Sequence, residues 1–89
     1  MSPKEKISKK QKRDFKQENF LILHNDDTHS FDYVIDALVE ICDHGYEQAE
    51  QCTLITHYKG RCDVKKGGFD ALKPLKNALN ERELIATID

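Results

Sequence analysis

Residues 20–42 read FLILHNDDTHSFDYVIDALVEIC, and this stretch decides the fold. Its first part, residues 20–24, is short, apolar and followed by turn-forming Asn and Asp, which is typical of a β-strand. Apolar residues then recur over residues 31–42 at the i, i+3, i+4, i+7 spacing, which predicts a helix with one buried face. Ser30 is the predicted N-cap of this helix, and Gly45 is its predicted stop.

A second helix is predicted over residues 46–58. Its residues Ala49, Cys52 and Ile55 share one face at helical spacing, so we expect that face to be buried. Gly60 follows the last turn, where a glycine commonly ends a helix.

The remainder of the chain predicts a strand, a helix and a strand. Residues 61–65 are a short candidate strand, which two glycines end. Asp70 is predicted to cap a third helix, with Pro74 in its first turn, where the missing N–H costs little. The segment ELIATI, residues 83–88, predicts a closing strand. The order β-α-α-β-α-β indicates an α+β domain, with a small three-stranded antiparallel sheet packed against three helices.

Length and composition narrow the class of protein. The chain has 89 residues, enough for one small domain, and it contains no run of about 18 apolar residues that would span a bilayer. The basic N-terminus has no apolar segment behind it, so we expect no secretory signal. Three cysteines without a disulfide framework indicate a reducing compartment, and we therefore expect a cytoplasmic location.

Charge is distributed unevenly along the chain. Residues 1–19 hold seven Lys/Arg and three Asp/Glu, whereas residues 20–89 hold seven Lys/Arg and thirteen Asp/Glu. With few large apolar residues, segment 1–19 is predicted to be a flexible basic extension of a domain at 20–89. A basic tail leaves open an alternative function, a small protein- or nucleic-acid-interaction domain, although the acidic body disfavours nucleic acid.

Signatures of metal binding and catalysis are weak. No CxxC or HxxxH pair occurs, and Cys42 and Cys52 fall on predicted core faces, so we expect no metal and no cofactor. Asp26 and Asp27 are adjacent carboxylates, but there is neither a glycine-rich phosphate loop nor a nucleophile elbow. A binding module is therefore favoured over an enzyme.

The polar stretch HNDDTHS, residues 24–30, has two possible interpretations. Asn and Asp bond their own backbone and stop strands, so one interpretation of the stretch is a turn with a helix cap. Alternatively its acceptors hold a charged ligand together with His57, which lies in the last turn of the second helix. A histidine there also complements the helix dipole, and composition alone favours the structural interpretation.

Two motifs at matching separation resemble the ClpS family, adaptors of the ATP-dependent Clp protease. Residues 25–27 read NDD, and residues 33–38 read YVIDAL, close to that family's pattern after its first strand. Residues 57–60 read HYKG, which resembles the end of the family's second helix. The resemblance covers residues 20–65 well and 66–89 loosely.

The resemblance implies an adaptor that binds N-degrons, the N-terminal degradation signals of proteins whose first residue is bulky and hydrophobic. It implies that Asn25, Asp26 and His57 accept hydrogen bonds from the free α-amino group of the substrate. Their amide, carboxylate and neutral imidazole acceptors match the three N–H donors and the charge of an ammonium. Asp27 would support the loop or the first peptide group.

The resemblance also implies a hydrophobic pocket for the first side chain, formed by Phe31, Val34, Thr53, Thr56 and Leu84. Phe31 stands where relatives carry a Met at the entrance, and Thr53 and Thr56 replace apolar residues. A bulkier entrance and a more polar wall predict altered or narrower selectivity for the first residue.

The resemblance further implies a partner, a Clp AAA+ unfoldase of the ClpA or ClpC type. Relatives dock it through an acidic residue that opens the third helix and through a later lysine. Asp70 would supply the acidic group, and Lys73 or Lys76 the basic one.

Overall fold

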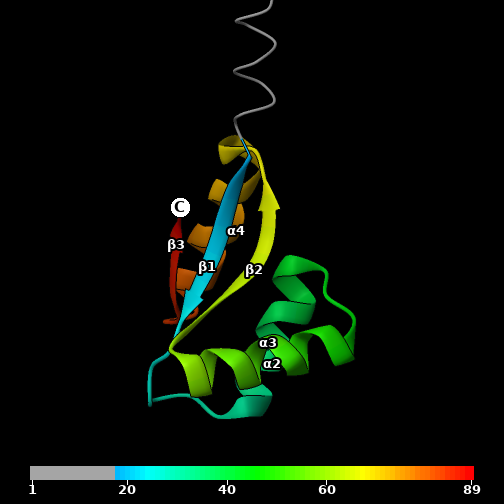
Figure 1. The fold of residues 1–89 in the computed structure, drawn as a ribbon, viewed down its shortest axis with the longest axis vertical. Helices are drawn as coiled ribbons and strands as arrows, with labels where there is room; N and C mark the ends of the chain where they lie inside the picture. The colour runs from blue at the N-terminus through cyan, green and yellow to red at the C-terminus, as the bar shows by residue number, and fades with distance from the viewer. Residues whose placement is uncertain (1–17) are drawn as a thin grey trace, which may run out of the picture.

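The computed structural model describes residues 18–89, and Figure 1 shows their arrangement. The predicted α+β architecture is confirmed. The elements in chain order are β1 (Asn19–His24), α2 (Phe31–Cys42), α3 (Tyr46–Lys59), β2 (Arg61–Gly67), α4 (Phe69–Glu81) and β3 (Ile85–Ile88). Strand β1 lies between β2 and β3, and both pairings are antiparallel. Most of the predicted basic extension, residues 1–17, lies outside the described part of the chain.

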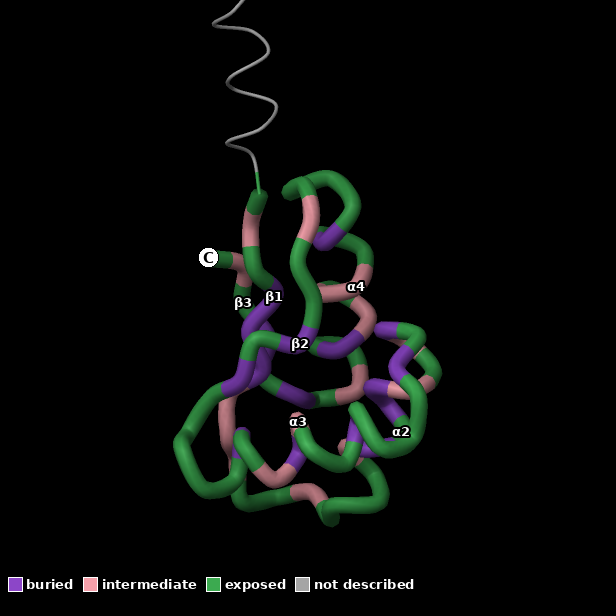
Figure 2. The backbone as a smooth tube through the Cα atoms, turned by 45° about the vertical axis from the view of Figure 1, so that its right-hand side comes forward, coloured by how far each residue is buried: buried purple, intermediate pink, exposed green. Residues whose placement is uncertain are grey.

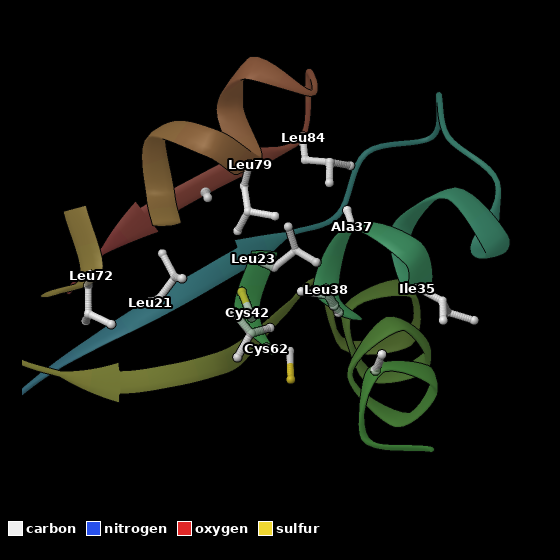
Figure 3. Close-up of a cluster of buried hydrophobic side chains, with 13 residues drawn as sticks. Leu21, Leu23, Ile35, Ala37, Leu38, Cys42, Cys62, Leu72, Leu79 and Leu84 are labelled. Atoms are coloured by element: carbon white, nitrogen blue, oxygen red, sulfur yellow. The ribbon is translucent and has the colours of Figure 1, made fainter. Parts of the chain in front are cut away.

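The hydrophobic core is built on the central strand. Leu21 and Leu23 of β1 are fully buried, and Leu38 of α2 and Leu79 of α4 pack against them (Figure 3). Buried residues, purple in Figure 2, gather where the sheet meets the helices. Each buried leucine contributes about 1.5–3 kcal/mol relative to an exposed one. Within residues 18–89, no helix combines the length and apolar character that crossing a membrane requires.

Helix α2 begins as predicted and ends differently. The Ser30 hydroxyl accepts a hydrogen bond from the Tyr33 N–H at 3.1 Å, which confirms the N-cap. Gly45 as the stop was wrong, because Asp43 adopts the left-handed conformation at the C-cap, with φ of 59°. An aspartate tolerates this conformation better than most residues do. Gly45 instead occupies the N-cap position of α3, with φ of −69°.

The predicted buried face of α3 was partly wrong. Ile55 is 39% exposed, whereas Thr53 and Thr56 are only 3% and 5% exposed. The two hydroxyls donate to the carbonyls of Ala49 and Cys52, each at 2.8 Å, one turn earlier in the helix. Because their polar groups are bonded within the helix, both threonines can be buried at little cost.

Two predictions at the start of α4 were also wrong. Gly68 is the N-cap and makes no side-chain bond, and Asp70 is the second helical residue rather than the cap. Pro74 lies one turn inside the helix, beyond the first four residues. At that position proline removes the hydrogen bond that residue 74 would donate to the carbonyl of residue 70.

The closing strand is shorter than predicted. Strand β3 begins at Ile85, because Glu83 has a left-handed φ of 68° and the Leu84 N–H bonds the Leu79 carbonyl at 3.1 Å. These residues therefore complete the turn that follows α4 and leave only four residues to pair with β1.

The sheet register brings three segments to one end of the molecule. His24, the last residue of β1, pairs with Arg61 on β2 and with Ile85 on β3. The Asn25 N–H then donates to the carbonyl of Gly60 at 2.9 Å. The loop after β1 is therefore joined directly to the end of α3, although 35 residues separate the two in the sequence.

Candidate binding site

A pocket opens at this end of the sheet, between the loop after β1 and the facing sides of α2 and α3. The empty space between its lining residues, open solvent at the mouth included, is about 350 Å³. The residues that line it are Leu23, His24, Asn25, Asp26, His29, Phe31, Val34, Thr53, Thr56, His57 and Leu84. Every predicted amino-group and pocket residue is in this set. Asp27, predicted to support the loop, is exposed and does not line the pocket.

Asp26 organises the loop that forms the polar rim. Its Oδ1 accepts hydrogen bonds from the N–H groups of Thr28 and His29, at 2.9 and 3.3 Å. The same oxygen lies 3.1 Å from Nδ1 of the His29 ring. Burial acts to raise the pKa of Asp26, but the Thr28 N–H and the His29 ring outweigh it and hold this pKa below its ordinary value. The rim therefore carries an ionised carboxylate at neutral pH.

Asn25 contributes an acceptor beside this carboxylate. Its backbone N–H is bonded to Gly60, and its side-chain amide nitrogen is 3.5 Å from Oδ1 of Asp27. A side-chain amide has separate donor and acceptor ends, so a contact on the nitrogen leaves the carbonyl oxygen for another partner. Asp27 thus contacts Asn25 within the loop.

Two aromatic rings meet at the pocket mouth. The centroids of the Phe31 and His57 rings are 5.2 Å apart, with the planes inclined by 69°, an edge-to-face contact between α2 and α3. Tyr58 contacts the other side of the His57 ring, with centroids 4.8 Å apart. Phe31 is 39% exposed, so its prediction as a residue of the buried α2 face was only partly right.

The inner wall of the pocket combines apolar side chains with two threonines. Leu84 is 4% exposed and Val34 is half-buried, and both reach the pocket from elements that flank the sheet end. The hydroxyls of Thr53 and Thr56 donate hydrogen bonds to backbone carbonyls of the helix. Apolar walls with a few polar groups at the rim are the usual composition of a ligand pocket.

Sequence reasoning missed three lining residues, Leu23, His24 and His29. Leu23 was placed only in the first predicted strand, and in the structure it lies on the strand face toward the helices. The two histidines were dismissed as ligands, yet His24 Nε2 is 2.7 Å from the Thr87 hydroxyl oxygen and His29 holds Asp26. The sequence does contain a pattern that could have indicated the contact of His29, namely a histidine three residues after an aspartate within a turn.

The predicted docking residues lie away from the pocket. Asp70 and Lys73 are exposed, and Lys76 is half-buried, all on the first half of α4. This helix starts where Gly67 of β2 pairs with Asn19, at the opposite end of β1 from the pocket. In Figure 1 the two ends of the sheet are clearly separate.

The thiols are part of the core and not of the pocket. Burial raises the pKa of Cys42 to about 11, and burial together with a hydrogen bond to Cys52 raises that of Cys62 to about 12. Such thiols are poor nucleophiles and poor metal ligands at neutral pH. Among residues 18–89, no group of three His, Cys, Asp or Glu side chains is placed to hold a metal ion.

The fold and the pocket define a small α+β domain with a pocket whose lining includes an ionised carboxylate, an amide and an imidazole. Residues 15–85 match the family described as ATP-dependent Clp protease adaptor protein ClpS, and the chain belongs to this family. It is a family of adaptors for a protease.

A solved structure shares the fold. Agrobacterium tumefaciens ClpS2, bound to L-phenylalaninamide, superposes with a TM-score of 0.76 at 18% sequence identity, covering 82% of this chain and 95% of that one. A search of curated proteins finds no match.

Proposed function

We propose that this adaptor binds the free α-amino group and the bulky hydrophobic first residue of N-degron proteins and delivers these proteins to a Clp AAA+ unfoldase. The observation that carries the proposal is that two predicted motifs, NDD at residues 25–27 and HYKG at 57–60, bring Asn25, Asp26 and His57 to the lining of one pocket. The role is one of binding and delivery, without catalysis, metal or cofactor.

The rim matches the chemistry of an α-ammonium group. An ammonium offers three donors and a positive charge. The Asn25 carbonyl oxygen, the ionised Asp26 carboxylate and the His57 ring are the acceptors we assign to it, and Asp27 supports the loop. L-phenylalaninamide, the ligand of the similar Agrobacterium protein, has the same two parts, an amino group and an apolar side chain.

The first side chain would enter the cavity below the rim. Burial of its apolar surface against Phe31, Val34 and Leu84 contributes about 25 cal/mol per Å². Thr53 and Thr56 complete the wall, with their hydroxyls turned to the helix backbone. The aromatic ring of Phe31 at the mouth restricts which first residues enter.

Fluorescent peptides that differ only at the N-terminus test this proposal. A peptide with a free N-terminal Leu or Phe should bind, and its acetylated twin should bind at least about a hundredfold more weakly, because acetylation removes the charge and leaves the rim acceptors unpaired. Equal affinity for both peptides, or no binding by any free N-terminus, would overturn the proposal. The His57→Ala and Asp26→Asn variants should each weaken binding of the free peptide only.

Delivery requires a separate surface, and we assign it to Asp70, Lys73 and Lys76 on α4. A variant with Asp70→Lys and Lys73→Glu should lose binding to an unfoldase of the ClpA or ClpC type while keeping its affinity for the peptide. Lys66→Glu, on strand β2, is the matched control. Unchanged docking by the double variant would show that the unfoldase uses another surface. The three reduced cysteines of this chain are compatible with action in the cytoplasm.

A nucleic-acid partner is not proposed. The folded part of the chain, residues 20–89, carries thirteen acidic against seven basic residues. A phosphate backbone would be repelled by this body.

A further inference from the structure

The ring of His29 is held firmly against Asp26. Its Nδ1 lies 3.1 Å from Oδ1 and 3.3 Å from Oδ2 of the carboxylate, and the side chains of both residues are only 14% exposed. An ionised carboxylate only accepts hydrogen bonds, so Nδ1 carries the proton in this contact. His29 is therefore the one side chain of the described residues that donates to Asp26.

The ring of His29 is itself held in place by Tyr33. It stacks on the ring of Tyr33, with centroids 4.6 Å apart and planes inclined by 13°. The Tyr33 hydroxyl donates to the carbonyl of Arg82 at 2.9 Å, at the end of α4. The Arg82 guanidinium in turn pairs with Glu40 on α2. The chain of contacts runs from the pocket rim through α2 to the turn before β3.

We propose that His29 is a positioning residue for N-terminus recognition, which fixes the Asp26 carboxylate for the α-ammonium of the substrate and opposes binding when it gains a second proton. This inference rests on the proposed function. While the ring is neutral, its N–H orients Asp26 and leaves the negative charge of the carboxylate for the substrate. A protonated ring is a cation beside the same carboxylate, so it competes with the incoming ammonium.

Other ionisable groups near His29 would also contribute to a pH dependence of peptide binding. They are His24, Asp26 and His57 in the pocket, Asp27 in the loop, Tyr33 on α2, and Arg82 with its partner Glu40. Of these groups, only His24 and His57 carry the same kind of ring as His29. A direct observation of the His29 ring is therefore needed, alongside substitutions that separate its stacking from its N–H.

Two substitutions at His29 make this separation. H29F keeps an aromatic ring to stack on Tyr33 and loses the N–H, whereas H29N keeps a donor close to the position of Nδ1 and cannot be protonated. We expect H29F to weaken binding of a peptide with a free N-terminal Leu about tenfold and H29N to change it less than about threefold. Between pH 8 and 5.5, affinity should fall more steeply for the wild type than for H29N. Equal affinities of H29F and the wild type, or identical pH profiles of H29N and the wild type, would overturn the inference.

A measurement on the wild-type protein keeps the test decisive if a variant does not fold. Ring resonances of His29 are followed by NMR during a pH titration, with and without saturating peptide. Because binding and protonation are linked reciprocally, the pH at which the His29 ring gains its proton should move down by about one unit in the complex. An unchanged midpoint overturns the inference. Failure of the wild type to bind any free N-terminus would instead overturn the proposed function, so the two failures are distinguishable.

Discussion

The ring of Phe31 meets the ring of His57 edge-on, with centroids 5.2 Å apart, and the contact joins α2 to α3 across the mouth of the pocket. One ring belongs to the predicted entrance and the other to the predicted amino-group site. In the proposed complex, two side chains in direct contact therefore position the side chain and the amino group of the first residue.

Shortening Phe31 should therefore change selectivity more than overall affinity. In Phe31→Ala, we expect affinity for peptides that begin with Trp or Phe to rise about three- to tenfold relative to a peptide that begins with Leu, because the mouth widens. A binding panel of peptides that differ only in residue one measures the ratio. Tyr58→Ala is the control, since Tyr58 touches the other side of His57 and does not line the pocket. The same shift in both variants would argue against an entrance role for Phe31.

Asp26 should stabilise the fold in a pH-dependent way. Its pKa is lowered from 3.8 in the folded protein, so its ionised form contributes stability that is fully present above pH 3.8 and is lost as pH falls through the lower, folded value. We expect Asp26→Asn to reduce the free energy of unfolding by about 1–2 kcal/mol at pH 7, and by much less at pH 2. Urea denaturation at several pH values measures this difference. The exposed Asp27→Asn is the comparison, and a pH-independent difference for Asp26→Asn would contradict the assignment.

Lys65 should stabilise the end of α2. Its Nζ donates to the carbonyl of Cys42 at 2.8 Å, and a cation at a helix C-terminus also interacts favourably with the helix dipole. Lys65→Met should lower the free energy of unfolding by about 1 kcal/mol. Lys66→Met removes the same charge from an exposed pair with Glu18 at 3.7 Å and should cost less than about 0.5 kcal/mol. Equal costs would mean that the bond to Cys42 contributes little.

Cys42 and Cys62 should resist thiol reagents while the protein is folded. Burial raises their pKa values to about 11 and about 12, so few thiolates exist at pH 8. In a Cys52→Ser background, the two remaining thiols should react with a chromogenic disulfide reagent at least about a hundredfold more slowly in buffer than in denaturant. Rapid reaction in buffer would show that one of them is reached by solvent in the folded protein.

Much of the fold follows from local patterns. The 3.6-residue period of α2 and the serine before it were enough to place the helix and its start, because a strong amphipathic face and a cap agree with each other, whereas the predicted stop at Gly45 was wrong. Helix α3 has no such face. Its burial is decided by threonines whose hydroxyls bond the helix backbone, and hydrophobic periodicity does not count them as core residues.

The candidate site, too, could be predicted only in part from the sequence. Asn25, Asp26 and His57 could be predicted from motifs and their spacing. The contact between His29 and Asp26 could not, because it depends on the conformation of a loop that strand and helix periodicity do not describe. The position of the loop beside the end of α3 follows from the pairing of His24 with Arg61 in the sheet.

The hydrogen bond from Asn25 to Gly60 has a thermodynamic consequence for recognition. This bond holds the loop after β1 to the carbonyl of Gly60, the residue before β2. The loop is therefore ordered together with the sheet before a ligand binds. Binding then needs little additional loss of backbone entropy, and a single residue at the start of a chain can supply enough contact free energy to be held. A change of selectivity in such a site is expected to come from side-chain substitutions, because a shift of the loop backbone would break the bond to Gly60.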